Sequence, residues 1–321
     1  MNRYNTTAII TCMIFMPLFA YAWDLGETGT YHFEAINQQV YVMHGPLEEP
    51  NKKNQGFMNN PAIIVSKTGI IVIDPGSSHL VGKQVLAEIK KVSSLPVVAV
   101  FNTHIHGDHW LANQALREAY PEANIYAHPK MIEQANGEQG IIWLESMERM
   151  TEGLSRGTQV IAPDHAVIQD NIITVAGAHF RIHAMIPTHT DTDIMIEHVE
   201  TKTLFLGDNC FYQRLGRFDT TASIHGNIAA LEYANKLKMA YYVPGHGQSG
   251  SAESAMLPFL HYLQKLKQVV KAGFEADLSD YEIKAKSAQQ FDAWRNWSGF
   301  DVNFGRHINK MYLEIESLEG F

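Results

Sequence analysis

The sequence predicts a layered α/β sandwich, in which strands dominate both halves of the chain and helices separate some of them. Short apolar runs recur from residue 40 to residue 243, and helix-like stretches lie between only some of these runs. A doubly wound parallel sheet would need stricter alternation. The composition supports a large core, because 45% of the 321 residues are hydrophobic and 18% are charged. Wholesale disorder and fibrous structure are excluded on the same grounds.

The expected elements follow from local patterns along the chain. The first strands cover residues 40–43, 62–66 and 70–74, and the last two form a hairpin around Lys67-Thr68-Gly69. Helices are expected over residues 80–92, 110–119 and 129–135, with strands over 97–101 and 125–127. The second half predicts strands over residues 172–175, 181–185, 194–198, 203–206 and 241–243, and one helix over 228–238.

The first 22 residues have the pattern of a secretory signal peptide. Arg3 supplies a positive start, residues 8–20 are almost wholly apolar, and Ala20-Tyr21-Ala22 forms a cleavage site. The apolar run is too short to span a bilayer of about 30 Å, so stable membrane insertion is not expected. We therefore expect a periplasmic or secreted protein. Cleavage would leave Cys210 as the only cysteine and exclude an intramolecular disulfide.

The charge balance disfavours nucleic acid as a partner. Lys and Arg number 25 against 34 Asp and Glu, which gives a formal net charge of −9, and no basic block is present. Histidine is unusually frequent, with 16 residues, and imidazole is a common ligand of transition metals. A small-molecule substrate and a metal site are the expectation that follows.

The chain after residue 250 differs in character from the part before it. Residues 251–271 and 301–315 carry apolar side chains at helical spacing, among them Phe259, Leu263, Phe304 and Ile308. We interpret residues 23–250 as a catalytic domain and residues 251–321 as a helical extension packed on it. A role of these helices in dimerisation is the alternative, and the sequence leaves the oligomeric state open.

The most informative segment is Phe101-Asn102-Thr103-His104-Ile105-His106-Gly107-Asp108-His109-Trp110. In extended backbone alternate side chains share a face, so His104 and His106 can reach one ion together. The chain then turns at Gly107, and Asp108 and His109 project in another direction. A second ion is suggested by that change of direction.

This segment resembles the signature of the metallo-β-lactamase-fold hydrolases, and four later or earlier markers agree with it in order. They are Asp74 at the end of an apolar run, His189 in Pro187-Thr188-His189-Thr190-Asp191, Asp208 in Leu206-Gly207-Asp208, and His246 in Pro244-Gly245-His246-Gly247. The resemblance covers roughly residues 30–250. It implies a four-layered αββα sandwich whose site lies along one edge, where loops from both sheets meet.

The resemblance also implies a binuclear metal site. His104, His106 and His189 would hold one ion, Asp108, His109 and His246 the other, and Asp208 would bridge them. Nitrogen and oxygen ligands suit two Zn²⁺ ions, and iron or manganese also fit. We expect Asp108 and Asp74 to serve catalysis, Asp74 by ordering the loop of the site. A metal-bridging hydroxide would attack the substrate without a serine or cysteine nucleophile.

These features predict a secreted binuclear zinc hydrolase that cleaves an ester, thioester or lactam carbonyl. The ligand set resembles the glyoxalase II branch, and the segment from Gly207 to Arg214 resembles periplasmic hydrolases associated with quinoprotein or sulfur-oxidation systems. A zinc β-lactamase proper is an alternative, in which Cys210 rather than Asp208 would be the ligand. The other alternative is a metal-bearing redox or binding partner of a periplasmic relay, against which His106 argues because flavin-coupled relatives usually carry Glu there.

Two segments could line the substrate pocket. Residues 45–60 could overhang the metals or form an exposed loop, and residues 136–157 could form a second wall or pack on the body, with Trp143 among them. Arg214 could contact an anion, and Trp110 could line the pocket floor or belong to the core. No functional context surrounds the remaining histidines, including His44, His128, His183 and His225.

Overall fold

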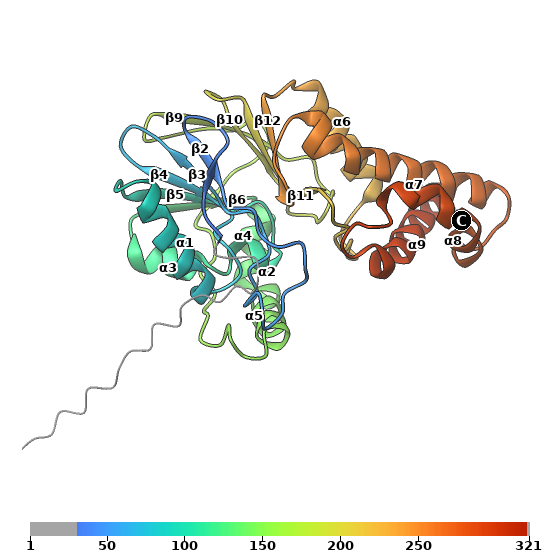
Figure 1. Ribbon diagram of the computed structural model, residues 1–321, viewed down its shortest axis with the longest axis horizontal. Coiled ribbons are helices and arrows are strands. Elements are labelled where there is room, and N and C mark those ends of the chain that lie inside the picture. Colours follow the sequence, from blue (N-terminus) through green and yellow to red (C-terminus); the bar gives the residue numbers. More distant parts are fainter. Residues whose placement is uncertain (1–30, 320–321) are drawn as a thin grey trace, which may run out of the picture.

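The computed structural model describes residues 31–319 and contains two β-sheets that face each other (Figure 1). The expected signal peptide over residues 1–22 lies outside the described residues. The larger sheet has the order β1-β2-β3-β4-β5-β6-β7, antiparallel up to β4 and parallel from β4 to β7. Its strands are β1 (Glu34–Ala35), β2 (Val40–Val42), β3 (Ala62–Val65), β4 (Ile70–Ile73), β5 (Val97–Phe101), β6 (Asn124–Ala127) and β7 (His165–Ala166).

The smaller sheet has the order β12-β11-β10-β9-β8 and comes from the second half of the chain. Its strands are β8 (Ile172–Val175), β9 (Ala178–His183), β10 (Met195–His198), β11 (Thr203–Phe211) and β12 (Tyr241–His246). All pairs are antiparallel except β11 with β12, which is parallel. Strand β11 is longer than expected: it continues past Leu206 through two register irregularities to Phe211, and all nine of its residues are buried.

Three layers of apolar packing hold the sandwich together. Between the sheets, residues such as Val42, Ile64 and Phe101 pack against Phe180 and Phe205 of the opposite sheet. Outside the larger sheet lie α1 (His79–Val92) and α3 (Asn113–Ala119), and outside the smaller one lies α6 (Ile224–Lys236). The predicted four-layered αββα arrangement is thus confirmed.

Three further helices surround the edge at which β5 and β6 end. These are α2 (Gly107–Trp110), α4 (Pro129–Asn136) and α5 (Glu138–Met150). The expectation of one helix over residues 110–119 was wrong at its start, because the chain makes the short α2, then turns and enters α3 only at Asn113. Trp110 is fully buried and its Nε1 donates to Ile105 O at 2.7 Å, so this side chain belongs to the core.

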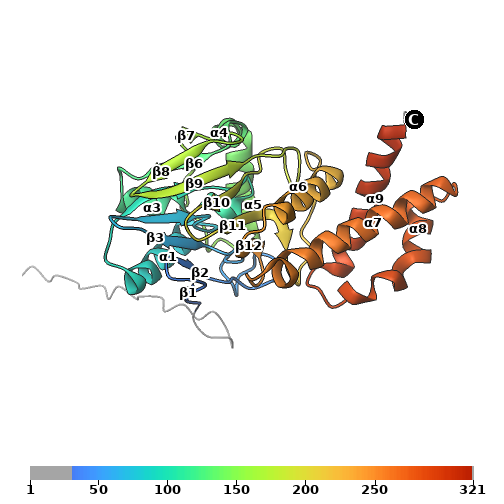
Figure 2. The same cartoon turned by 90° about the horizontal axis from the view of Figure 1, so that it is seen from above.

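The chain after β12 is helical, as expected, and extends from one end of the sandwich (Figures 1 and 2). It comprises a π-helical turn η2 (Ala252–Met256), α7 (Leu257–Glu275), α8 (Asp280–Ser287), a 3-10 segment η3 (Ala288–Trp294) and α9 (Phe300–Glu319). Its core is continuous with α6, since Phe259, Leu263 and Ile308 belong to the same apolar cluster as Ile228 and Leu231. Within residues 31–319, no helix combines the length and the apolar character needed to cross a bilayer.

Because His307 of α9 is buried, we expect the stability of the helical region to fall at acidic pH. Its Nδ1 lies 2.9 Å from Tyr262 Oη, its Nε2 donates to Gly216 O at 2.8 Å, and burial lowers its pKa to about 4. A histidine in the unfolded chain has a pKa of about 6.5, so between these values the unfolded state binds more protons and stability falls as the pH falls. The full loss would be about 3 kcal/mol.

The variant H307Q keeps an amide donor near Nε2 but cannot ionise. Between pH 7 and pH 4.5 its free energy of unfolding should fall by about 2 kcal/mol less than that of the wild type. Urea denaturation followed by circular dichroism at both pH values measures the difference. Equal losses in the two proteins would show that His307 is not the group that titrates.

Candidate metal centre

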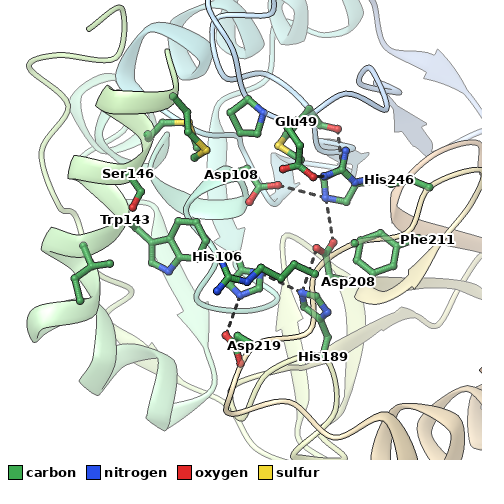
Figure 3. Close-up of a pocket in the computed structure, with 18 of the residues that line it drawn as sticks. Glu49, His106, Asp108, Trp143, Ser146, His189, Asp208, Phe211, Asp219 and His246 are labelled. Carbon is green, nitrogen blue, oxygen red and sulfur yellow. Dashed lines mark hydrogen bonds and ion pairs between the residues drawn. The ribbon is translucent and has the colours of Figure 1, made fainter. Parts of the chain in front are cut away.

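All seven predicted ligand residues meet at one edge of the sandwich, in two adjoining groups. Figure 3 shows the members that face the cavity, which are His106, Asp108, His189, Asp208 and His246. Candidate ligand atoms within each group lie within 4.8 Å of one another. The groups are His104, His106, His189 and Asp208, and Asp108, His109 and His246. The division matches the two predicted spheres, and Asp208 has one carboxylate oxygen turned toward each.

Different elements of both sheets supply these residues. His104 and His106 follow β5, and Asp108 and His109 lie on α2, which begins directly after them. His189 lies on the connection from β9 to β10, Asp208 lies within β11, and His246 ends β12. The site therefore exists only when the two sheets face each other, because neither sheet contains a complete group.

Asp74 holds one histidine of each group from behind. Its Oδ2 lies 2.8 Å from His109 Nδ1 and also accepts the hydroxyl of Thr103 at 2.7 Å, while its Oδ1 accepts Thr103 N–H at 2.8 Å. Because the Thr103 hydroxyl donates to Asp74, its oxygen accepts from His104 Nδ1 at 3.0 Å. Asp74 does not line the cavity, so it acts by orienting other side chains.

The outward nitrogen of His246 is satisfied in the same way, with Nδ1 donating to Met58 O at 2.8 Å. In each of the three rings the outward Nδ1 carries a proton, which leaves Nε2 as the nitrogen that can bind a metal at the centre. The buried Nε2 atoms of His104 and His109 and the Oδ1 of Asp208 have no hydrogen-bond partner. Buried polar atoms are rarely left without a partner, so these three atoms are suited to bind a metal ion.

The distances and the donor set fit metal ions. His106 Nδ1 and His189 Nε2 are 3.0 Å apart, close to the roughly 3.3 Å that separates two nitrogens bound tetrahedrally to zinc at about 2.0–2.1 Å. His109 Nε2 is 3.3 Å from Asp108 Oδ2 and 3.1 Å from Asp208 Oδ1. Neutral imidazole and carboxylate ligands suit Zn²⁺, iron and manganese.

Backbone geometry leaves room for the Asp208 carboxylate at the centre. Gly207 has φ +53, and a Cβ there would lie 2.8 Å from the Thr103 side chain. A Cβ on Gly245 would lie 2.0 Å from Asp208 Oδ1. Glycine at 245 therefore leaves room for the Asp208 carboxylate, and glycine at 207 lets β11 approach Thr103 closely. The register of β11 is irregular at this point.

The electrostatics of the centre call for cations. Burial lowers the pKa of His104 well below its usual value and that of His189 to about 3, so both rings are neutral at pH 7. Burial alone would raise the pKa of Asp108 and Asp208, but protons on His109 and His246, whose pKa values these carboxylates raise in turn, hold the pKa of both carboxyls well below the usual range. Bound cations would take the place of those protons. Two ionised carboxylates in a buried site are stabilised by bound cations.

A cavity of about 320 Å³ opens over the two groups. His106, Asp108, His189, Asp208 and His246 form its floor. Its walls come from α5 with Trp143, Met147 and Met150, and from the 45–60 segment with Glu49, Pro50 and Met58. The end of β11 and the residues after it supply Phe211, Arg214, Arg217 and Asp219. Both segments that the sequence marked as possible walls therefore line the cavity.

Arg214 does not reach the cavity as a free cation. It is 4% exposed, its Nη2 lies 2.7 Å from Glu49 Oε1, and its Nη1 donates to Leu47 O. The expected anion contact is replaced by a tether that holds the 45–60 segment over the floor. Cys210 is buried and belongs to the apolar core, with Sγ 3.4 Å from Ala255 O, and neither ligand group contains it.

Two supporting carboxylates were not predicted. Asp193 is buried, and its Oδ2 accepts from Thr188 Oγ1 at 2.9 Å and from Thr190 Oγ1 at 3.0 Å, which fixes the loop of His189. Asp219 Oδ2 lies 3.4 Å from His106 Nε2. Asp191, the last residue of the motif around His189, contacts Lys130 away from the two groups.

Sequence comparison decides the family. The model of the metallo-beta-lactamase superfamily matches residues 55–246, more than half of the chain and all seven candidate ligands. The chain belongs to the metallo-beta-lactamase superfamily. A probable metallo-hydrolase of Streptococcus pyogenes serotype M6 is 24% identical over 212 residues, which are 63% of this chain and 85% of that protein. These findings make the protein a metal-dependent hydrolase.

A second relative is the hydroxyacylglutathione hydrolase of Francisella tularensis subsp. holarctica, 26% identical over 163 residues. The match covers 51% of this chain, and this chain spans about half (52%) of the length of that enzyme. Similarity to the glyoxalase II type is thus present over the part that both share.

Solved structures show the same fold. A metallo-beta-lactamase from Pontibacter korlensis superimposes with a TM-score of 0.58 at 18% identity, over 73% of this chain and 99% of that one. A stereoselective inverting sec-alkylsulfatase from Pseudomonas sp. has a TM-score of 0.69 at 15% identity, over 88% of this chain and 50% of that one. The latter superposition spans enough of this chain to reach beyond the superfamily match.

Proposed function

We propose that the protein is a binuclear zinc hydrolase of the periplasm or the extracellular space that cleaves a small ester, thioester or lactam. The observation that carries this proposal is the pair of adjoining ligand groups whose lone pairs converge under an open cavity. The predicted signal peptide supports the compartment, and the shared segment with a hydroxyacylglutathione hydrolase supports a carbonyl substrate.

The residues of the chain divide the work between binding and orientation. When bound, a pair of zinc ions supplies a hydroxide nucleophile at neutral pH and polarises the carbonyl. His104, His106 and His189 would hold one ion, Asp108, His109 and His246 the other, and Asp208 both. Asp108 also lines the cavity, where its carboxylate can take the proton that the nucleophile releases and pass it to the leaving group.

The cavity walls orient a substrate with an apolar part. Trp143, Met147 and Met150 form one side, and Met58 and Phe211 face them from the other segments. Such surfaces exclude water from the reacting atoms and strengthen the electrostatic contacts at the floor. The buried Cys210 gives no support to a β-lactamase of the cysteine-ligand type.

A substrate panel tests the proposal. The metal-loaded protein is assayed with a thioester, a phenyl ester, a lactone, a cephalosporin, a phosphodiester and an alkyl sulfate. The variant H106A is assayed in parallel, and H128A is the control because its ring lies outside both groups. We expect turnover of at least one of the first four, loss in H106A and in chelator-treated protein, and recovery with zinc. Inertness across these four with bound iron would favour a redox or binding role instead.

A further inference from the structure

Asp219 points one carboxylate oxygen at a candidate ligand and fixes the other in its own turn. Oδ2 lies 3.4 Å from His106 Nε2, on the side of the ring away from His189 (Figure 3). Oδ1 accepts from Thr221 N and from Thr221 Oγ1, both at 2.8 Å. The carboxylate is thereby held in one orientation toward the histidine ring.

This contact selects the state of His106 that can bind a metal. An imidazole that donates its Nε2 proton to a carboxylate leaves Nδ1 with a lone pair, and His106 Nδ1 faces His189 Nε2 at 3.0 Å. A carboxylate partner of this kind also fixes the ring orientation and raises the basicity of the ligand nitrogen. Trp143 packs against the same ring, with centroids 4.8 Å apart.

The segment that carries Asp219 connects β11 to α6, and the helical region holds its first part. Ser298 N donates to Gln213 O at 2.9 Å, and Leu215 N donates to Ser298 O at 2.8 Å. From α9, Asn303 Nδ2 donates to Leu215 O and His307 Nε2 donates to Gly216 O, both at 2.8 Å. The Tyr262 hydroxyl of α7 fixes the His307 ring through Nδ1.

The same helix holds the end of this segment. Glu314 accepts from Ile224 N at 2.8 Å and from His225 N at 3.0 Å, which are the first two residues of α6, and from His225 Nδ1 at 2.8 Å. His307 and Glu314 are seven residues apart, so they lie two turns apart on one face of α9. This face of α9 therefore contacts the chain on both sides of Asp219, at the start of the connection and at the first turn of α6.

Phe218 also connects α9 with the metal centre through ring contacts. Phe218, the residue before Asp219, lies with its ring centroid 5.0 Å from that of His307 and 5.7 Å from that of His189. A shift of α9 would consequently move Phe218, Asp219 and the side chains that they contact.

We propose that α9 completes the metal centre. Through His307 and Glu314 it fixes the connection between β11 and α6, and Asp219 on that connection fixes His106 as a ligand. Asp219 and His307 are positioning residues, and the helical extension is part of the site. The inference rests on the metal-binding part of the proposed function and is independent of the substrate.

Metal affinity of the full-length protein is the test, because it does not depend on turnover. Apo protein is titrated with Zn²⁺ against a chromophoric chelator, and with Co²⁺ while its absorption spectrum is recorded. D219N should weaken the affinity for one of the two ions by about 10- to 100-fold and alter the cobalt spectrum. H307L should act in the same direction, and H307Q, which retains a donor to Gly216 O, should restore most of the affinity.

A double-mutant cycle separates positioning from general damage. If His307 acts through Asp219, H307L should add little to the loss in D219N. The matched control is H198L, since His198 is also buried but lies at the far end of β10, where its Nδ1 contacts Thr201 Oγ1 at 2.7 Å. Should H307L fail to fold, E314A takes its place in the cycle with the same expectation.

Two outcomes would overturn the inference. One is an unchanged affinity for both ions in D219N and in H307L or E314A, and the other is full additivity in the double variant. Failure of the proposed function would look different, because the wild-type protein would then bind no metal at all.

Discussion

Asp208→Ala should abolish binding of a complete metal pair and lower kcat/KM by more than about 100-fold. Loss of a residue that only orients a ligand already lowers metal affinity or activity by about 10- to 100-fold. Asp208 directs one carboxylate oxygen at each group. Its Oδ2 lies 3.7 Å from His104 Nε2 and 3.5 Å from His189 Nε2, and its Oδ1 lies 3.1 Å from His109 Nε2 and 3.3 Å from His246 Nε2. Without it, no carboxylate spans the four ring nitrogens, because Asp108 Oδ2 lies near only two of them, at 3.3 Å from both His109 Nε2 and His246 Nε2.

The measurement combines metal content by elemental analysis with kinetics on the substrate found in the panel. Asp191→Ala is a suitable control, because that carboxylate lies near His189 in the sequence but contacts Lys130 and Gln134 outside the site. The control should retain two ions and wild-type kinetics. A D208A protein with two tightly bound ions and unreduced turnover would refute the bridging role.

Asp74→Ala should have the second largest effect, although Asp74 does not line the cavity and belongs to neither ligand group. Removal leaves His109 Nδ1 and the Thr103 hydroxyl without their acceptor, and through Thr103 it frees His104 as well. One histidine in each sphere then loses its fixed ring orientation. Because each outer-shell contact accounts for about 10- to 100-fold, we expect a loss of about 100-fold or more in metal affinity and in kcat/KM.

Thr103→Val resolves the two branches of this network. Valine has the shape of threonine without the hydroxyl, so it disconnects His104 from Asp74 and leaves the contact with His109 intact. Its loss should be smaller than that of D74A. Metal titration of both apo proteins at pH 7 provides the comparison, and a D74A variant that binds both ions within a few-fold of the wild type would contradict the orienting role.

The sequence was sufficient to predict the fold class and the candidate ligands that stand in a recognisable local motif. The cluster from His104 to His109 lies in one stretch of chain, and His189, Asp208 and His246 each stand in a local context that marks them. The structure brings these residues together, as predicted. The predicted strand ended at residue 206 because Gly207 and Asp208 interrupt the apolar pattern. The observed β11 passes through both residues with an irregular register.

The supporting residues were not predictable, for physical reasons that differ from case to case. Asp219 has no repeat or motif around it, and its proximity to His106 depends on the path of a connection that α9 fixes. Helix α9 in turn acts on backbone carbonyls, among them Leu215 O and Gly216 O, and a backbone carbonyl has no signature in a sequence. Helical spacing therefore predicted that α9 packs on the body, but not that it supports the site.

Zinc titration of the apo protein with activity as the readout tests the central claim most directly. Two ions held by seven side chains predict no hydrolysis without metal, and a rise in activity that ends near two equivalents of Zn²⁺ per chain. Catalysis by protein that holds no metal, or a chain that binds none at micromolar concentrations, would contradict the account.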